Sequence, residues 1–143
     1  MTTSVPAGFV PFATTTGFIA HNGPYYARML DDGGYEYGFR SDAARHGNPN
    51  GVLHGGSVLG FVDTILGHLV VHTTRRPCAT VSLDSRFIAG APPGAWITGH
   101  ARIRSLTKSM AFVDAEALAG DRLLLTATSV FRIFPDPATR QAT

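Results

Sequence analysis

The residues best suited to chemistry are a His-Gly-Gly turn and an aspartate a short way beyond it. His54, Gly55 and Gly56 open the most apolar stretch of the chain, and Asp63 lies in the middle of that stretch. The first amides of a helix have no partner within it, and the macrodipole makes that end positive, so a helix start without large side chains favours an anion. A carboxylate within an apolar helix is costly unless it is paired or used. Together these residues predict an oxyanion site and a general base.

A helix over about residues 55–73 is expected to position these groups. At 100° per residue its apolar side chains cover one broad face, while glycines and the aspartate fall on a narrow second stripe. Such a stripe lets a ligand or another backbone approach the carboxylate. The alternative is that the glycines only allow tight packing against a sheet, at a cost of about 1 kcal/mol each relative to alanine. The broad face comprises Val58, Val62, Ile65 and Leu69, with Leu59, Leu66 and Val70 beside it, and the stripe comprises Gly56, Gly60, Asp63 and Gly67.

The segments on either side of the helix predict an antiparallel sheet. A hairpin is expected where Tyr25–Leu30 and Tyr35–Arg40 flank a turn of two aspartates and two glycines. Residues 41–53 are expected to form a loop, because Gly, Asn and Pro cluster there. After the helix, residues 80–88 alternate, with Val81, Leu83 and Phe87 on one side and Thr80, Ser82, Asp84 and Arg86 on the other. Three more strands, at 95–104, 110–119 and 122–134, follow with short turns, as in a meander.

The fold class is therefore α+β, with one long helix buried against an antiparallel sheet. The chain has 143 residues, enough for one domain, and its 44% hydrophobic and 15% charged residues indicate a compact globular protein. We expect residues 1–16 to be coil or a short helix, residues 17–134 to form the domain, and residues 135–143 to be a tail.

The composition also limits the expected cellular compartment and the expected binding partners. Cys78 is the only cysteine, which excludes an internal disulfide and fits a reducing, cytoplasmic compartment. No signal peptide is expected, because the first eight residues include no basic side chain. The apolar stretch Val58–Val71 is interrupted by Asp63 and two glycines, so no membrane span is expected. A formal charge of +2 gives no indication of nucleic-acid binding.

Helix geometry alone implies that two chains share the site. Gly55 and Asp63 are eight residues apart, so a continuous helix separates their Cα atoms by about 12 Å. An oxyanion donor and a base must each come within about 3 Å of the reacting group. One aspartate side chain cannot close that gap. The site therefore needs Gly55 of one chain and Asp63 of another, as in a two-fold symmetric dimer whose helices run antiparallel.

The order of elements and the motif together resemble the hotdog-fold thioesterases. The resemblance is carried by Asn48-Pro49-Asn50-Gly51-Val52-Leu53-His54-Gly55-Gly56, then the apolar helix with Asp63, then Thr80-Val81-Ser82-Leu83-Asp84. It is closest to the phenylacetate-degradation type within the 4-hydroxybenzoyl-CoA thioesterase superfamily, and it covers about residues 17–134. It implies a hotdog fold, in which an antiparallel sheet wraps a long central helix. It also implies that two chains join their sheets into one continuous sheet with active sites at the interface, and that dimers often form tetramers.

The resemblance implies a role for each matched residue. The Gly55 amide would donate to the thioester carbonyl oxygen, and His54 would shape that turn and support the site by hydrogen bonding. Asn48 would orient the attacking water or the carbonyl. Asp63 would act as a general base on water or as a nucleophile through a mixed anhydride. Ser82 matches, with one residue skipped, the strand hydroxyl that assists the water in some members.

The expected substrate is an acyl-CoA ester, and coenzyme A enters only as part of it, so no cofactor is expected. Gly56 lies beside the oxyanion donor and is a candidate substrate contact. Arg75, Arg76 and Lys108 are candidates for the phosphates of coenzyme A, although paired arginines in a loop are more often solvated surface. The acyl group itself is open: Phe9, Phe12 and Phe18 suggest an apolar lining suited to an aromatic or medium acyl group, or are ordinary core.

No metal site is expected. His68 and His72 stand one helical turn apart and could bind a metal, but no third ligand follows at a suitable spacing. Histidines near a helix C-terminus are also favoured by the helix dipole.

Two other functions remain open at this point. A hotdog hydratase or dehydratase would use a histidine with an acidic partner to move a proton at carbon, which fits the His-Gly-Gly placement less well. A non-catalytic acyl-CoA-binding protein is the other alternative. Thioester hydrolysis fits best, because negative charge builds on the carbonyl oxygen while water loses a proton.

Overall fold

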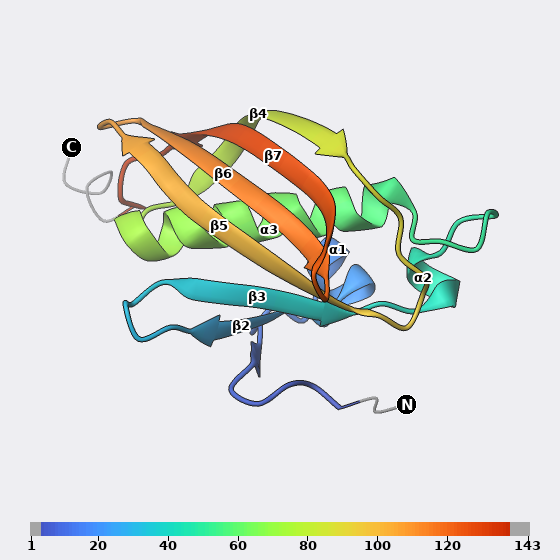
Figure 1. The fold of residues 1–143 in the computed structure, drawn as a ribbon. Helices are drawn as coiled ribbons and strands as arrows, with labels where there is room; N and C mark the ends of the chain where they lie inside the picture. Colours follow the sequence, from blue (N-terminus) through green and yellow to red (C-terminus); the bar gives the residue numbers. More distant parts are fainter. Residues whose placement is uncertain (1–3, 138–143) are drawn as a thin grey trace.

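A computed structural model describes residues 4–137 of the chain. In it a seven-stranded antiparallel sheet curves around one long helix, α3 (Gly55–Thr74), as Figure 1 shows. The strands are β1 (Val10–Pro11), β2 (Tyr26–Met29), β3 (Tyr35–Arg40), β4 (Cys78–Phe87), β5 (Trp96–Leu106), β6 (Met110–Ala119) and β7 (Arg122–Ile133). Two short helices, α1 (Gly17–Asn22) and α2 (Ala43–His46), precede α3. The α+β class, the hairpin β2–β3 and the meander β5–β6–β7 are confirmed.

The strand order β1-β2-β3-β5-β6-β7-β4 places β4 at one end of the sheet. β4 follows α3 in the chain but pairs with β7, the last strand, so β5 lies three strands away from it. Among residues 4–137, no strand pairs with the outer edge of β4. An unpaired edge presents free backbone donors and acceptors that a second chain can use.

The core lies between α3 and the concave face of the sheet. In the predicted apolar face of the helix, Leu59 and Leu69 are only partly buried. Phe61, which is not part of that predicted face, is fully buried. Burying a side chain of this size is worth about 1.5–3 kcal/mol, so the contact with α3 accounts for much of the stability of the domain. The buried residues of the helix are Ser57, Val58, Phe61, Val62, Ile65, Leu66 and Val70.

The sequence predicts no membrane span, yet α3 is long and apolar enough to cross a membrane by length and composition alone. The core helix of a globular domain passes the same test, and α3 buries its apolar face against its own sheet.

Two local features differ from the sequence-based expectations. The segment 1–16 was expected to be coil or a short helix, but Val10 and Pro11 form β1 and pair with β2. Two residues are too few to show a period, and a proline is tolerated on an edge strand. The loop 41–53 contains α2, whose start is capped by Asp42, which accepts a hydrogen bond from the Arg45 N–H. Of the expected tail, residues 138–143 lie outside the described part of the chain.

Candidate active site

The start of α3 leaves one amide free. His54 is the N-cap, and its Nδ1 accepts a hydrogen bond from the Gly56 N–H over 2.9 Å. The Ser57 N–H donates to the His54 carbonyl over 2.9 Å. Within residues 4–137, the Gly55 N–H has no hydrogen-bond partner. Of the first three amides of the helix, only that of Gly55 is therefore available, and it is the amide that the sequence predicts as the oxyanion donor. The Gly56 amide is already hydrogen-bonded to His54.

The turn before α3 is held by a buried histidine that the sequence analysis missed. The His46 side chain is 1% exposed. The backbone carbonyl of His46 accepts a hydrogen bond from the His54 N–H over 2.7 Å. Its Nδ1 accepts from the Asp42 N–H over 2.9 Å, which makes Nε2 the donor to the Asn22 carbonyl at 2.6 Å. His46 thereby ties α1, α2 and the first turn of α3 together. It belongs to no local motif, so only the fold reveals it.

Asp63 is partly buried on the side of α3 that faces β4. Its Oδ1 accepts a hydrogen bond from the Thr80 hydroxyl over 2.7 Å. Burial and the nearby Asp63 carboxylate raise the pKa of the Cys78 thiol, so that cysteine stays protonated at neutral pH. The Cys78 thiol donates to the Gly67 carbonyl over 3.7 Å. Asp63 is thus fixed by one hydroxyl, with its second oxygen free in the contacts described.

The hydroxyl beside Asp63 belongs to Thr80 and not to Ser82, which the sequence analysis matched to that role. A β-bulge at Val81 shifts the register between β4 and β7. Thr80 pairs with Phe131, which is buried against α3, whereas Ser82 pairs with Val130 on the opposite face of the sheet. The bulge also leaves Val81 60% exposed. The simple alternation expected for residues 80–88 is therefore wrong at its start, and the structure does not bring Ser82 to Asp63.

Asn48 shapes the loop that leads into α3. Its Oδ1 accepts hydrogen bonds from the Asn50 N–H over 2.9 Å and the Val52 N–H over 3.3 Å. Its backbone N–H donates to the Val52 carbonyl over 2.8 Å. This is the turn-forming use of an asparagine side chain. A role toward substrate for the remaining side-chain amide group stays a prediction.

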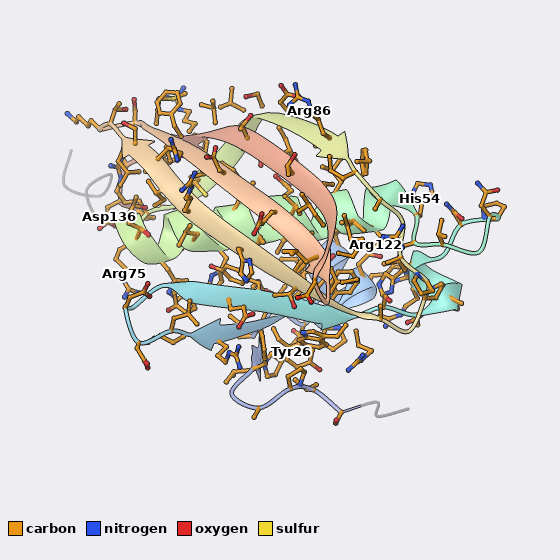
Figure 2. All side chains as sticks on the ribbon, viewed as in Figure 1. Tyr26, His54, Arg75, Arg86, Arg122 and Asp136 are labelled. Atoms are coloured by element: carbon orange, nitrogen blue, oxygen red, sulfur yellow. The ribbon has the colours of Figure 1, made fainter. Side chains whose placement is uncertain are left out.

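Arg75, Arg76 and Lys108 lie at the far end of α3 from the Gly55 amide. Figure 2 shows His54 and Arg75 at opposite ends of this helix, a span of about 30 Å for twenty residues. The Arg76 side chain donates to the Phe134 carbonyl over 2.8 Å and to the Lys108 carbonyl over 2.9 Å, so it holds the end of β7 in place. The structure does not bring these three side chains to the Gly55 amide of the same chain.

His68 and His72 contact tyrosines. The Nδ1 of His68 lies 3.0 Å from the Tyr37 hydroxyl, and the Nδ1 of His72 lies 3.3 Å from the Tyr35 hydroxyl. Burial, with His72 beside it, lowers the pKa of His68 to about 4. In the described range 4–137, no three His, Cys, Asp or Glu residues gather as metal ligands would.

Neither of two sizeable hollows on the chain contains the predicted catalytic groups. One, of about 500 Å³, lies on the outer face of the sheet over β4–β7, and the other, of about 540 Å³, lies between the N-terminal segment, β2 and His68. Gly55 and Asp63 line neither. Since α3 is continuous from Gly55 to Thr74, both groups lie on one rod about 12 Å apart. One chain by itself therefore carries two separated halves of the predicted site.

Comparison with known proteins identifies the family of this chain. The model of the thioesterase superfamily matches residues 50–126, which include the turn at His54, all of α3 and β4 with Thr80. The chain belongs to the thioesterase superfamily. It is also 30% identical over 132 residues to the protein named "Putative esterase PA0474" of Pseudomonas aeruginosa, covering 91% of this chain and 98% of that one.

Solved structures share the fold of this chain. The PaaI protein from the phenylacetic acid degradation operon of Escherichia coli superposes with a TM-score of 0.71 at 15% identity, over 78% of this chain and 80% of that one. A protein of Streptococcus pneumoniae described as a hypothetical thioesterase, solved with coenzyme A, gives a TM-score of 0.70 at 18% identity, over 78% of this chain and 87% of that one. The predicted hotdog fold, with its long central helix and antiparallel sheet, is confirmed.

Proposed function

We propose that this protein hydrolyses acyl-CoA thioesters, with the Gly55 amide as oxyanion donor and Asp63 of a second chain as general base. The observation that carries the proposal is the free Gly55 N–H at the start of the same helix on which Thr80 fixes the Asp63 carboxylate. Membership of the thioesterase superfamily supports the reaction class. The related fold solved with coenzyme A supports a CoA ester as the substrate.

In this mechanism water attacks the thioester carbonyl carbon while Asp63 accepts one of its protons. The carbonyl oxygen gains negative charge, which the Gly55 N–H and the positive end of the α3 dipole stabilise. The tetrahedral intermediate then expels the thiolate of coenzyme A, and the proton held by Asp63 returns to the products. The Thr80 hydrogen bond keeps one carboxylate oxygen in place so that the other faces the water.

The proposal requires a dimer, since one helix holds the two groups apart. The unpaired edge of β4 is the candidate contact, because no strand within residues 4–137 covers it and Val81, at the bulge of this strand, is 60% exposed. Pairing of two β4 strands around a two-fold axis would extend the sheet across both chains and place the α3 helices antiparallel. Association of dimers into tetramers, which the family resemblance implies, is part of the same proposal.

A panel of acyl-CoA esters tests this function. Purified protein is incubated with each ester, and free coenzyme A is measured with a thiol reagent after subtraction of the Cys78 signal from a substrate-free sample. We expect hydrolysis by the wild-type protein and a fall in kcat of about 10²–10⁴-fold in Asp63→Asn. Activity unaffected in that variant would reject Asp63 as the base. Loss of the enoyl-CoA absorbance without thiol release would indicate a hydratase, and tight binding without turnover would indicate a binding protein.

A further inference from the structure

Two exposed phenyl rings lie directly against glycines in the first half of α3. A Cβ atom at Gly55 would lie 2.9 Å from Cε1 of Phe87, and a Cβ atom at Gly60 would lie 2.5 Å from Cζ of Phe18. Carbon atoms in contact prefer separations of about 3.5–4.0 Å. The two rings therefore fill the space in which side chains at these helix positions would stand. In contrast, a Cβ at Gly67 would meet Phe131 at an ordinary 3.4 Å.

Neither of these rings belongs to the hydrophobic core. Phe18 comes from α1 and is 55% exposed, and Phe87 comes from the end of β4 and is 58% exposed. Burial of a phenylalanine contributes free energy to folding, and these two half-exposed rings forgo a large part of that contribution. Phe87 also contacts the residue that carries the proposed oxyanion amide, and Phe18 contacts the helix one turn before the proposed base. Exposed apolar side chains at such positions are typical of a surface that contacts a ligand or another chain.

Their positions relate directly to the proposed reacting groups. Phe87 packs on the residue that carries the free amide, and Phe18 packs on Gly60, one helical turn before Asp63 on the same stripe. A thioester carbonyl held by the Gly55 N–H must therefore lie next to the Phe87 ring. Gly60 lies about 140° around the helix axis from Gly55 but only about 60° from Asp63. Phe18 therefore faces the proposed site from the chain that supplies Asp63, and its ring is the second apolar surface for the acyl group.

We propose that Phe87 and Phe18 wall the acyl-binding part of the thioester site, and that the site therefore takes apolar acyl groups and rejects acyl groups with a charged end. This inference rests on the proposed function and adds the substrate class and two residues to it. Phe87 shields the carbonyl and the Gly55 amide from bulk water, which strengthens their hydrogen bond. Phe18 sets the length of acyl group that fits, because its ring occupies the space that a longer chain would need.

The experiment measures kcat and KM for straight-chain acyl-CoA esters from acetyl to dodecanoyl, together with butyryl-CoA against succinyl-CoA. These are compared in the wild type, Phe18→Ala, Phe18→Leu and Phe87→Ala. Phe112→Ala is the matched control, because Phe112 is also exposed, at 40%, but pairs with Val130 on the outer face of the sheet. Light scattering on each variant follows its oligomeric state.

We expect the wild type to prefer butyryl over succinyl, and Phe18→Ala to shift the optimum toward longer chains while Phe18→Leu shifts it less. Phe87→Ala should lower kcat for every ester with little change in the optimum, and Phe112→Ala should match the wild type. Hydrolysis with an unchanged length profile in Phe18→Ala, or equal rates for butyryl and succinyl, overturns this inference and leaves the thioesterase function standing. Dissociation of the dimer in Phe18→Ala or Phe87→Ala also overturns it and assigns the rings to the subunit contact. Absence of hydrolysis for every ester overturns the proposed function itself.

Discussion

The Thr80 hydroxyl donates a 2.7 Å hydrogen bond to Oδ1 of Asp63, joining the edge strand β4 to the central helix. A carboxylate that accepts a charge-assisted hydrogen bond is held in one orientation. The bond therefore connects the strand at the open edge of the sheet to the proposed base, so that changes at this edge should be felt in catalysis.

Thr80→Val, which keeps the shape and removes the hydroxyl, should lower kcat by about tenfold, which corresponds to the roughly 1.5 kcal/mol of a hydrogen bond to a charged group. KM should change little, because Thr80 acts through Asp63. Thr80→Ser retains the hydroxyl and should recover most of the rate. Equal loss in both variants would point to packing of the threonine methyl group instead. Ser82→Ala serves as the comparison and should be close to the wild type, since Ser82 lies on the other face of the sheet.

Removal of the Gly55 N–H tests the oxyanion donor. Gly55→Pro deletes the N–H at the first helical position, where proline is well tolerated, and the extended backbone of His54, at ψ 131°, suits a residue before proline. Gly55→Ala adds the same crowding against Phe87 but keeps the N–H. We expect kcat in Gly55→Pro to fall about 10²–10³-fold below Gly55→Ala. Thermal melts of both variants confirm that each is folded.

Mixed dimers test whether the site is shared between chains. Asp63→Asn and Gly55→Pro chains, each inactive alone, are mixed, dissociated and reassociated. If the site joins Gly55 of one chain to Asp63 of the other, half of the dimers are mixed and each has one intact site, which gives about one quarter of the wild-type activity. Sites contained within single chains would give no recovery. Light scattering confirms that the dimers have reformed.

His68 should make the protein less stable in mild acid. Its pKa is lowered to about 4 in the folded chain from an ordinary value of 6.5, so the unfolded chain binds the extra proton over that interval. The free energy of unfolding should therefore be constant, as far as His68 is concerned, above pH 6.5 and fall as the pH drops from 6.5 toward 4. His68→Gln should flatten this part of the profile in denaturant titrations. An unchanged slope would assign the acid sensitivity to other groups.

Two glycine-to-alanine changes should have opposite effects on stability. A Cβ at Gly99 of β5 would lie 2.6 Å from Cδ1 of Ile65 and 2.8 Å from Cε1 of Phe61, both fully buried. Gly99→Ala should therefore cost about 1–3 kcal/mol. Gly67→Ala meets only an ordinary contact, so it should gain up to about 1 kcal/mol from helix propensity. Urea unfolding measures both, and stabilisation by Gly99→Ala would show that the helix–sheet contact is looser than described.

The elements with a long regular pattern could be predicted from the sequence. The helix was expected at about 55–73 and spans Gly55–Thr74, and β6 runs over the expected residues 110–119. Local periodicity and turn residues specify such segments because their side chains alternate between core and solvent at a fixed spacing. The His-Gly-Gly turn was also readable, since the chemistry of a helix start depends on consecutive residues.

Pairings between distant segments were decided by the tertiary structure. The sequence by itself determined the long helix, the α+β class, the glycine amide at the helix start and the aspartate at a fixed distance along the helix from it. Only the folded sheet determined that β4 lies beside β7, that a bulge at Val81 turns Thr80 rather than Ser82 toward Asp63, and that Phe18 and Phe87 rest on helix glycines. The physical reason is that a one-residue change of register reverses which side chains face the helix, and register is set by contacts with a strand more than forty residues away.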